Sequence, residues 1–397
     1  MLVDLLIKNV NLASMTDNRQ PYGSILNTCI AVSGGKIVAI DEQREAHTVV
    51  DAAGGWLTPG LIDCHTHLLF GGDRADEFDQ RLQGASYAEI SRRGGGIASS
   101  VKATREMSVE DLVAAGKVRL QNLLMEGVTS VEIKSGYGLD LDTEANLLRA
   151  ATQLQQQLPQ HISRTYLGAH ALPREFNDND AYIDYIVEQV MPALASKGLI
   201  DAVDVFCEGI GFSTSQCKRV FEAAQQLTLP IKAHAEQLSD LKGARLAAEY
   251  GALSVDHVEY LQPEDVPALK ASGTVAVVLP GAFYFLREQQ LPPIDALRAH
   301  QVPIAVATDF NPGSSPIGSL LTVMNMACVL FRLTPEEVLR GVTVNAAQAL
   351  GLSNKGKLAI GHDADLLLWE VDTPAQIMAS IGLIKPTQVW IGGTACR

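Results

Sequence analysis

Short apolar runs alternate with amphipathic helical stretches through residues 58–354. Eight runs are strand candidates, and helical patterns such as 108–127 and 142–158 separate most of them. Strands alternating with helices are typical of βα units around a parallel sheet. Eight such units predict an α/β fold, a (β/α)8 barrel of the TIM type, whose active sites lie at the carboxyl ends of the strands. The predicted strands cover residues 57–64, 127–133, 164–169, 202–207, 230–233, 253–256, 274–279 and 302–308.

The two ends of the chain carry a different pattern, with short apolar alternations broken by turn residues. Gly34-Gly35 lies between two such alternations and fits a hairpin turn. We therefore expect residues 1–57 and 355–397 to form one small β-sandwich domain beside a barrel domain of residues 58–354. A doubly wound open sheet is the alternative for the central part, although no GxGxxG motif follows an early strand.

Composition narrows the choice of partners. The net charge of −14 and the pI near 5.1 argue against nucleic acid or an anionic membrane surface, which both attract basic patches. No apolar run reaches the roughly 18 residues of a membrane span. Six scattered cysteines without a CxxC pair indicate reduced thiols and a cytoplasmic protein.

The predicted strands end in residues that can bind a metal ion. His65 and His67 follow the first strand and, two positions apart, point the same way. A histidine taken alone is more often a hydrogen-bonded core residue, but these residues form a set at one end of a barrel. The other strand ends carry His170, Cys207-Glu208, His234, His257 and Asp309.

Three imidazoles and one carboxylate form a donor set that suits zinc, iron or nickel and leaves a position for water. A metal in this set lowers the pKa of the water and supplies hydroxide as a nucleophile. Asp309 could take the proton of the water and later deliver it to a leaving nitrogen. His257 could polarise the carbonyl under attack, or act as a fifth ligand.

The order HxH, His, His, Asp on eight strands resembles the amidohydrolase superfamily, metal-dependent barrels with a β-sandwich built from both termini. Within it, the chain is similar over essentially its whole length to the imidazolonepropionase family of histidine degradation. The most specific stretches are VEIKSGYGLDLDTEANLLR, LGAHALP, KAHAEQLS, VDHVEY and ATDFNPGSSP.

The resemblance implies hydrolysis of 4-imidazolone-5-propanoate to N-formimino-L-glutamate, with opening of the ring at its amide C–N bond. It also implies a homodimer with one zinc or iron ion per subunit. The implied metal ligands are His65, His67, His234 and Asp309, and the implied substrate contacts are Arg74, Tyr137, His170, Gln237, Asn311, Gly313 and Ser314.

Two of these contacts make physical sense, and each has an alternative. The guanidinium of Arg74 matches the propionate carboxylate of the substrate, unless Arg74 is a solvated loop residue. Tyr137 stands between two glycines that let its hydroxyl approach a small ligand, unless it only packs at the barrel rim.

Several charged residues allow competing interpretations. Lys134 is not the carbamylated bridging lysine of two-metal amidohydrolases, because that lysine belongs at the end of the fourth strand. That position has Cys207-Glu208, so a single metal is favoured, with Glu208 as a bridging ligand the alternative. Glu236 is either a catalytic proton carrier or a residue that supports the site through an ion pair.

Two other functions compete with cyclic amide hydrolysis. Purine and pyrimidine aminohydrolases commonly have a glutamate where this chain has Gln237, and Arg74 suits a carboxylate better than a ring. A metal-free scaffold would have lost ligands, and all four are present. The RRGGG run at 92–96 lacks the Lys-Ser/Thr ending of a nucleotide loop and is expected to be a mobile loop near the mouth of the site.

Overall fold

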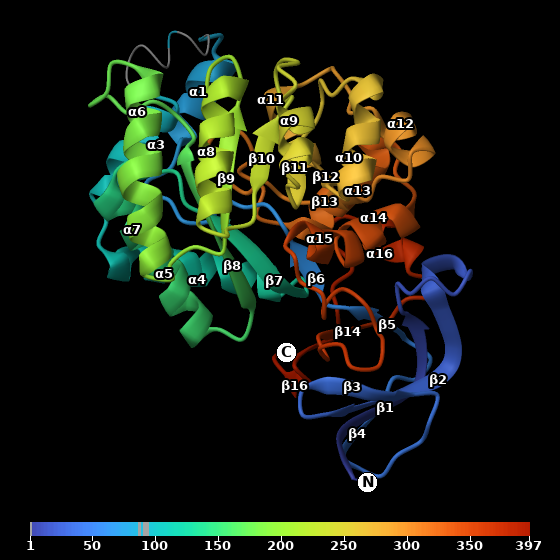
Figure 1. Cartoon of the computed structure of the whole chain (residues 1–397). Helices are drawn as coiled ribbons and strands as arrows, with labels where there is room; N and C mark the ends of the chain where they lie inside the picture. The colour runs from blue at the N-terminus through green and yellow to red at the C-terminus, as the bar shows by residue number, and fades with distance from the viewer. Residues whose placement is uncertain (1, 86–88, 90–94) are drawn as a thin grey trace.

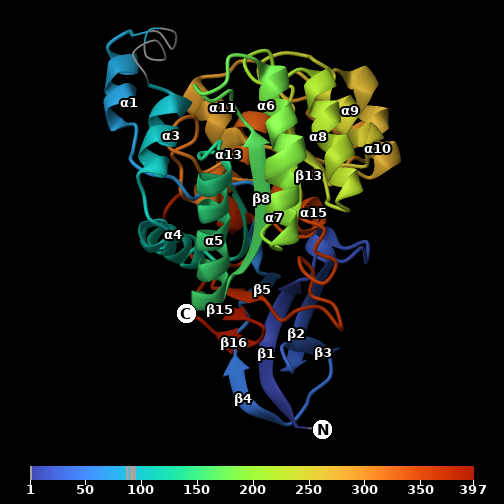
Figure 2. The same ribbon diagram turned by 60° about the vertical axis from the view of Figure 1, so that its left-hand side comes forward.

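The computed structural model describes residues 2–85, 89 and 95–397. Residues 92–94 of the RRGGG run therefore lie outside the described residues. Two eight-stranded sheets organise the described chain, a parallel one that forms a barrel and a mixed one that contains both termini. Figures 1 and 2 show the barrel with its ring of helices, and the mixed sheet at one end of it.

The parallel sheet confirms the predicted (β/α)8 barrel. Its strands pair in the order of the sequence, from β6 to β13, as successive right-handed βα units require. They are β6 Leu61–Asp63, β7 Val128–Lys134, β8 His161–Ala169, β9 Ala202–Cys207, β10 Lys232–Ala235, β11 Ser254–His257, β12 Val275–Val278 and β13 Ile304–Val306. In Figure 2, β8 runs away from the mixed sheet, so the carboxyl ends of the strands lie at the far end of the barrel.

The first and last strands of the barrel meet just beyond their carboxyl ends. The Asp309 N–H donates to His65 O at 3.0 Å, and the His67 N–H donates to Phe310 O at 3.0 Å. Below them, the buried carboxyl group of Asp63 accepts the backbone N–H of Thr308 at 3.1 Å and its hydroxyl at 2.7 Å. The bonds that close the barrel thus bring the His65–His67 segment against Asp309.

The helices that cover the barrel begin at polar caps. Ser108, Ser213 and Thr334 each form a capping box that satisfies the first free N–H groups of α4, α8 and α14. Among the described residues, no helix has the length and apolar character that a membrane crossing requires. The helices are α1 Ala75–Leu82, α3 Ile97–Arg105, α4 Val109–Leu124, α5 Leu141–Gln157, α6 Asn179–Tyr185, α7 Met191–Ser196, α8 Thr214–Gln226, α9 Gly243–Glu249, α10 Val266–Ser272, α11 Pro280–Leu286, α12 Ile294–Ala299, α13 Leu320–Phe331, α14 Pro335–Gly341, α15 Val344–Ala349 and α16 Ala375–Ala379, with short turns η1 Pro21–Gly23, η2 Ile186–Val190 and η3 Pro263–Asp265.

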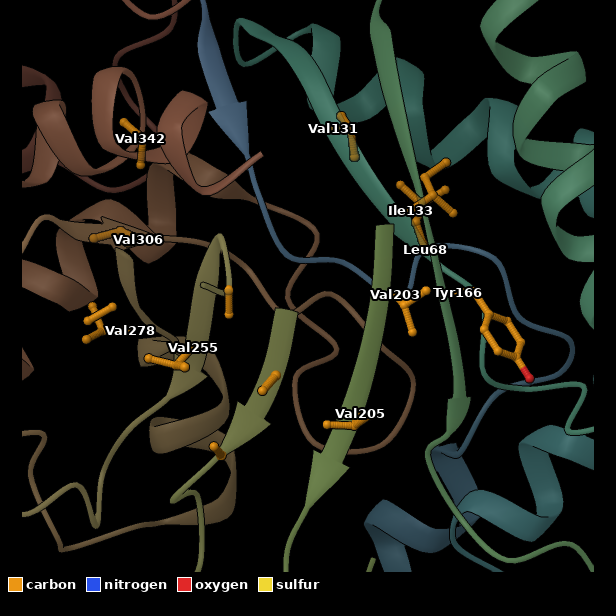
Figure 3. Close-up of a cluster of buried hydrophobic side chains, with 14 of the residues drawn as sticks. Leu68, Val131, Ile133, Tyr166, Val203, Val205, Val255, Val278, Val306 and Val342 are labelled. Carbon is orange, nitrogen blue, oxygen red and sulfur yellow. The ribbon is translucent and has the colours of Figure 1, made fainter. Parts of the chain in front are cut away.

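Alternation along the barrel strands separates apolar from charged side chains. Val131 and Ile133 of β7, and Val203 and Val205 of β9, belong to the main apolar cluster, which includes residues of the covering helices (Figure 3). Glu132, Lys134 and Asp204 occupy the alternate positions of these strands, point to the other face and are fully buried in ion pairs. On β7 and β9, period-two geometry therefore places charged side chains inside the barrel and apolar side chains outside it.

The mixed sheet joins the two ends of the chain, as predicted. It is called the terminal sheet below, and its order is β16-β15-β14-β5-β1-β2-β3, with β4 paired to β1. The predicted turn at Gly34-Gly35 is confirmed, because Ser33 pairs with Lys36 across it. The strands are β1 Val3–Ala13, β2 Ser24–Ser33, β3 Lys36–Ile40, β4 Ala46–Asp51, β5 Trp56–Pro59, β14 Leu366–Trp369, β15 Gln388–Ile391 and β16 Thr394–Ala395.

One predicted strand is wrong in detail. Residues 57–64 do not form a single strand, because the chain passes from the terminal sheet (β5) to the barrel (β6) at Gly60. A Cβ atom on Gly60 would lie 2.1 Å from Thr129 Oγ1, so only glycine fits this close crossing. The Gly60 N–H donates to Asp365 O in the last part of the chain, while the Leu61 N–H donates to Gly127 O beside β7.

The closure of the barrel can be tested at Thr308. Thr308→Val keeps the shape of the side chain but removes the hydroxyl that donates to Asp63 and accepts from the Phe310 N–H. We expect a loss of about 1–3 kcal/mol in the free energy of unfolding, because a buried acceptor loses a partner. Urea unfolding measures this free energy. Thr308→Ser, which keeps the hydroxyl, should be destabilised less than Thr308→Val. Equal stability of Thr308→Val and the wild type would contradict this account.

Candidate metal centre and active site

Four predicted ligands converge at the carboxyl end of the barrel. His65 and His67 follow β6, His234 lies in β10, and Asp309 follows β13; all four are buried. Nε2 of His67 lies 3.2 Å from Nε2 of His234. Oδ1 of Asp309 lies 3.4 Å from Nε2 of His65 and 3.5 Å from Nε2 of His67.

These separations fit a metal ion. Ligands about 2.0–2.1 Å from a tetrahedral ion are about 3.3 Å from one another, close to the three measured distances. Burial lowers the pKa of His65 and of His67 well below the ordinary value, with help from neighbouring positive charge, so neutral rings offer lone pairs. Nε2 of His65 has no hydrogen-bond partner. A divalent metal would satisfy that nitrogen together with the other three donors.

Two carboxylates orient the histidines from behind. Nδ1 of His65 lies 2.6 Å from Asp256 Oδ2, and Nδ1 of His234 lies 3.1 Å from Asp204 Oδ2. A carboxylate at Nδ1 keeps the proton on that nitrogen and leaves Nε2 free for a metal. Asp256 therefore fixes the tautomer and the direction of the His65 ring, and the carboxylate of Asp204 lies beside the corresponding nitrogen of His234.

The two carboxylates belong to a buried ionic network of Glu132, Lys134, Asp204, Lys232 and Asp256. Nζ of Lys134 lies 2.6 Å from Asp204 and 2.9 Å from Glu132, and Nζ of Lys232 lies 2.8 Å from Glu132. The sequence patterns described above did not identify this network as part of the site. The available signal was charged residues at alternate positions of apolar strands, such as Glu132 and Lys134 around Ile133.

His257 joins the donors from β11. Its ring centroid lies 5.8 Å from that of His65 and 5.5 Å from that of His234. A nitrogen of His257 and donor atoms of His65 and Asp309 all lie within 4.8 Å of one another. The backbone φ angle is 84° at His257 and 63° at Val258. A positive φ angle is strained at a β-branched residue such as Val258. Such strain is typical of functional sites.

Arg74 lies at the start of α1, beside the loop that follows Asp309. Its Nε donates to Ser100 Oγ at 3.0 Å, and a Cβ atom on Gly313 would lie 2.2 Å from its Nη1. Glycine at 313 therefore leaves the space that the guanidinium occupies. A cavity of about 350 Å³ opens here, lined by Arg74, Asn311, Phe310 and further residues of α1 and α11.

Asn311 organises the loop 311–315. Its Oδ1 accepts the N–H groups of Gly313 and Ser314, both at 2.8 Å, while its Nδ2 donates to Asp309 O at 2.7 Å. Nη2 of Arg81 donates to Gly313 O at 3.3 Å. The loop is thus tied both to the metal ligand before it and to α1.

Tyr137 and His170 form an aromatic wall next to His67. The His170 ring stacks on His67 with centroids 5.3 Å apart, and the Tyr137 ring lies 5.9 Å from His67. Burial lowers the pKa of His170 to about 4, and its Nδ1 lies 2.9 Å from Gly136 O. Since a carbonyl only accepts, Nδ1 carries the proton and Nε2 is an acceptor.

The loop that presents Tyr137 is shaped by the buried carboxylate of Glu144. This carboxylate accepts the backbone N–H groups of Gly136, Gly138 and Leu139.

Two acidic candidates are engaged in hydrogen bonds with nearby loop and helix residues. Both oxygens of Glu236 accept N–H groups at the start of α9, from Gly243 and Ala244, each at 2.7 Å. Glu208 accepts the N–H of Leu238 at 2.8 Å and the hydroxyl of Ser239 at 2.5 Å. These bonds favour structural support over proton transfer for Glu236 and over metal bridging for Glu208. Gln237, which follows Glu236, is buried.

Known proteins place this chain in a family. A model of the amidohydrolase family matches residues 56–396. The imidazolonepropionases of Alteromonas mediterranea and Pseudoalteromonas atlantica are 56% and 55% identical to it, and each alignment covers 98% of both chains. An atrazine chlorohydrolase from Arthrobacter aurescens, solved with zinc, has the same fold, with a TM-score of 0.76 at 16% identity over 98% of this chain and 94% of that chain. The chain therefore belongs to the amidohydrolase family and, within it, to the imidazolonepropionases.

Proposed function

We propose that this protein hydrolyses the ring amide C–N bond of 4-imidazolone-5-propanoate and releases N-formimino-L-glutamate, a step of histidine degradation. The observation that carries the proposal is the convergence of His65, His67, His234 and Asp309 at distances that suit one metal ion. The full-length similarity to imidazolonepropionases supports the choice of substrate.

His65, His67, His234 and Asp309 would hold a zinc or iron ion, which would supply hydroxide near neutral pH by lowering the pKa of bound water. Asp309 takes the proton of the attacking water with one carboxylate oxygen and delivers it to the ring nitrogen as the C–N bond breaks. His257 donates a hydrogen bond to the carbonyl oxygen, where negative charge develops during attack. Its place beside His65 and Asp309 supports this role.

The substrate carboxylate is held by Arg74 in this proposal. The cavity beside Arg74 and Asn311 is large enough for a small ligand, and a guanidinium offers paired donors to a carboxylate. Asn311, Gly313 and Ser314 would contact the substrate from the loop that surrounds Arg74. Their mutual hydrogen bonds hold that loop in one conformation.

The heterocycle would bind against Tyr137, His170 and Gln237. Neutral His170 offers Nε2 as an acceptor to a ring N–H, and the Tyr137 hydroxyl stays protonated because burial raises its pKa. Gln237 can both donate and accept without titrating. Glu236 supports the segment after His234 by binding the first N–H groups of α9.

Further proposals concern the setting of the enzyme. Residues 58–354 would be the catalytic domain, and residues 1–57 and 355–397 a single second domain. The six cysteines are free thiols in the described structure, which supports a cytoplasmic location. A homodimer is proposed from the similarity to imidazolonepropionases.

Removal of the metal tests the function directly. Turnover of imidazolone propionate, followed by the loss of its ultraviolet absorbance, should stop after chelation and return when zinc or iron is added. A parallel sample that is diluted without chelator controls for inactivation. Protein that holds the metal but leaves this substrate untouched would overturn the substrate assignment, and ring amines of purines and pyrimidines would be tested next.

Replacement of Arg74 tests the carboxylate contact. Arg74→Gln should raise KM roughly 10- to 150-fold, because a hydrogen bond to a charged group contributes about 1.5–3 kcal/mol. The propionamide analogue of the substrate, which lacks the charge, is the matched control. Arg74→Gln should raise the KM for this analogue much less. If Arg74→Gln affects the acid and the amide equally, Arg74 does not bind the carboxylate.

A further inference from the structure

We propose that Lys134 is a positioning residue of the metal centre. Its ammonium holds Asp204 and Asp256, the carboxylates behind His234 and His65, so that both imidazoles aim Nε2 at one point. This inference rests on the proposed metal centre and deepens it, because it assigns a role to a buried lysine that makes no contact with the proposed substrate cavity.

The geometry singles out Lys134 within the ionic network. Its Nζ lies 2.6 Å from Asp204 Oδ2 and 3.6 Å from Asp256 Oδ2. The same Asp204 oxygen lies 3.1 Å from Nδ1 of His234, and the same Asp256 oxygen lies 2.6 Å from Nδ1 of His65. One ammonium thus contacts the oxygens that orient two different ligands on β10 and after β6.

Lys232 provides an internal comparison. It is as buried as Lys134 and belongs to the same network, but its closest partners are Glu132 Oε1 at 2.8 Å and Cys64 O at 2.9 Å. Its Nζ lies 3.9 Å from Asp256, and no contact of Lys232 with Asp204 is present among the described residues. Lys232 therefore binds mainly Glu132, a carboxylate that does not lie behind either histidine.

The balance of charge explains why a lysine serves here. Three carboxylates and two ammonium groups lie out of water, where an unpaired charge is very costly. Without Lys134, Asp204 loses its nearest cation and has to turn or take up a proton. In either case His234 loses the carboxylate that lies beside its Nδ1, and its ring is free to rotate away from the other proposed ligands.

The network also contains a second set of possible metal donors, His65, Glu132 and Asp256, within 4.8 Å of one another. Lys134 and Lys232 already supply positive charge to these two carboxylates. The ammonium groups therefore stand where a second cation would otherwise be required. This agrees with a single metal held by the four convergent donors above them.

Metal affinity of the matched lysine variants tests the inference. Lys134→Met and Lys232→Met remove equal charge at equal burial, so both should lower the urea midpoint of the metal-free protein. Competition with a chromophoric chelator for zinc should show a 10- to 100-fold weaker affinity for Lys134→Met, the range expected when a group behind a ligand is lost. The zinc affinity of Lys232→Met should be less than threefold weaker than that of the wild type. Visible spectra of the cobalt forms should differ from the wild type only for Lys134→Met.

A second pair covers the case in which methionine prevents folding. Lys134→Gln and Lys232→Gln keep a hydrogen-bond donor and should show the same order of metal affinity. In the double variant with Asp204→Asn, Lys134→Gln should add little further loss, because both changes act through His234. Equal losses of affinity for the two lysines, or additive losses in the double variant, would overturn the role of Lys134. A wild-type protein that binds no metal would instead overturn the proposed function.

Discussion

Five charged side chains are buried together inside the barrel, and the geometry above them depends on their pairing. The three carboxylates, Glu132, Asp204 and Asp256, are fully buried. Their charged partners are the ammonium groups of Lys134 and Lys232. Buried ions are tolerated only when they are paired with good geometry. In the proposed centre the lysines position the carboxylates, the carboxylates position the imidazoles, and the imidazoles define the point at which a metal would bind.

Much of this arrangement follows from local sequence rules. Alternation of strand and helix predicts the barrel, and the rule that active sites lie at the carboxyl ends of strands predicts that His65, His67, His234 and Asp309 meet. Neither rule needs a distance between strands. The identity of the donors was therefore readable, although no local pattern indicates the 3.2 Å between His67 and His234.

The ionic network could not be read in the same way. Glu132, Asp204 and Asp256 lie on three strands far apart in the sequence, and their partners follow from how those strands are staggered. Glu236 is a second example, since its place close to His234 was compatible with either a chemical or a supporting role. In the structure, α9 begins at Gly243, and the side chain of its N-cap residue Lys242 makes no capping hydrogen bond. Glu236, seven residues before the helix, accepts the first N–H group in its place. No local sequence pattern predicts a helix cap from a residue so far from the start of the helix.

The terminal sheet has a consequence for the order of synthesis on the ribosome. β5 pairs with β1 from the start of the chain and with β14 from near its end, and β6 follows β5 immediately. The strand that precedes His65 and His67 is therefore anchored beside a sheet that stays incomplete until residues 366–369 have been synthesised. The anchor of the first two proposed metal ligands is complete only after β14 has left the ribosome. A nascent chain stalled before β14 would carry every ligand and still lack the anchor for two of them.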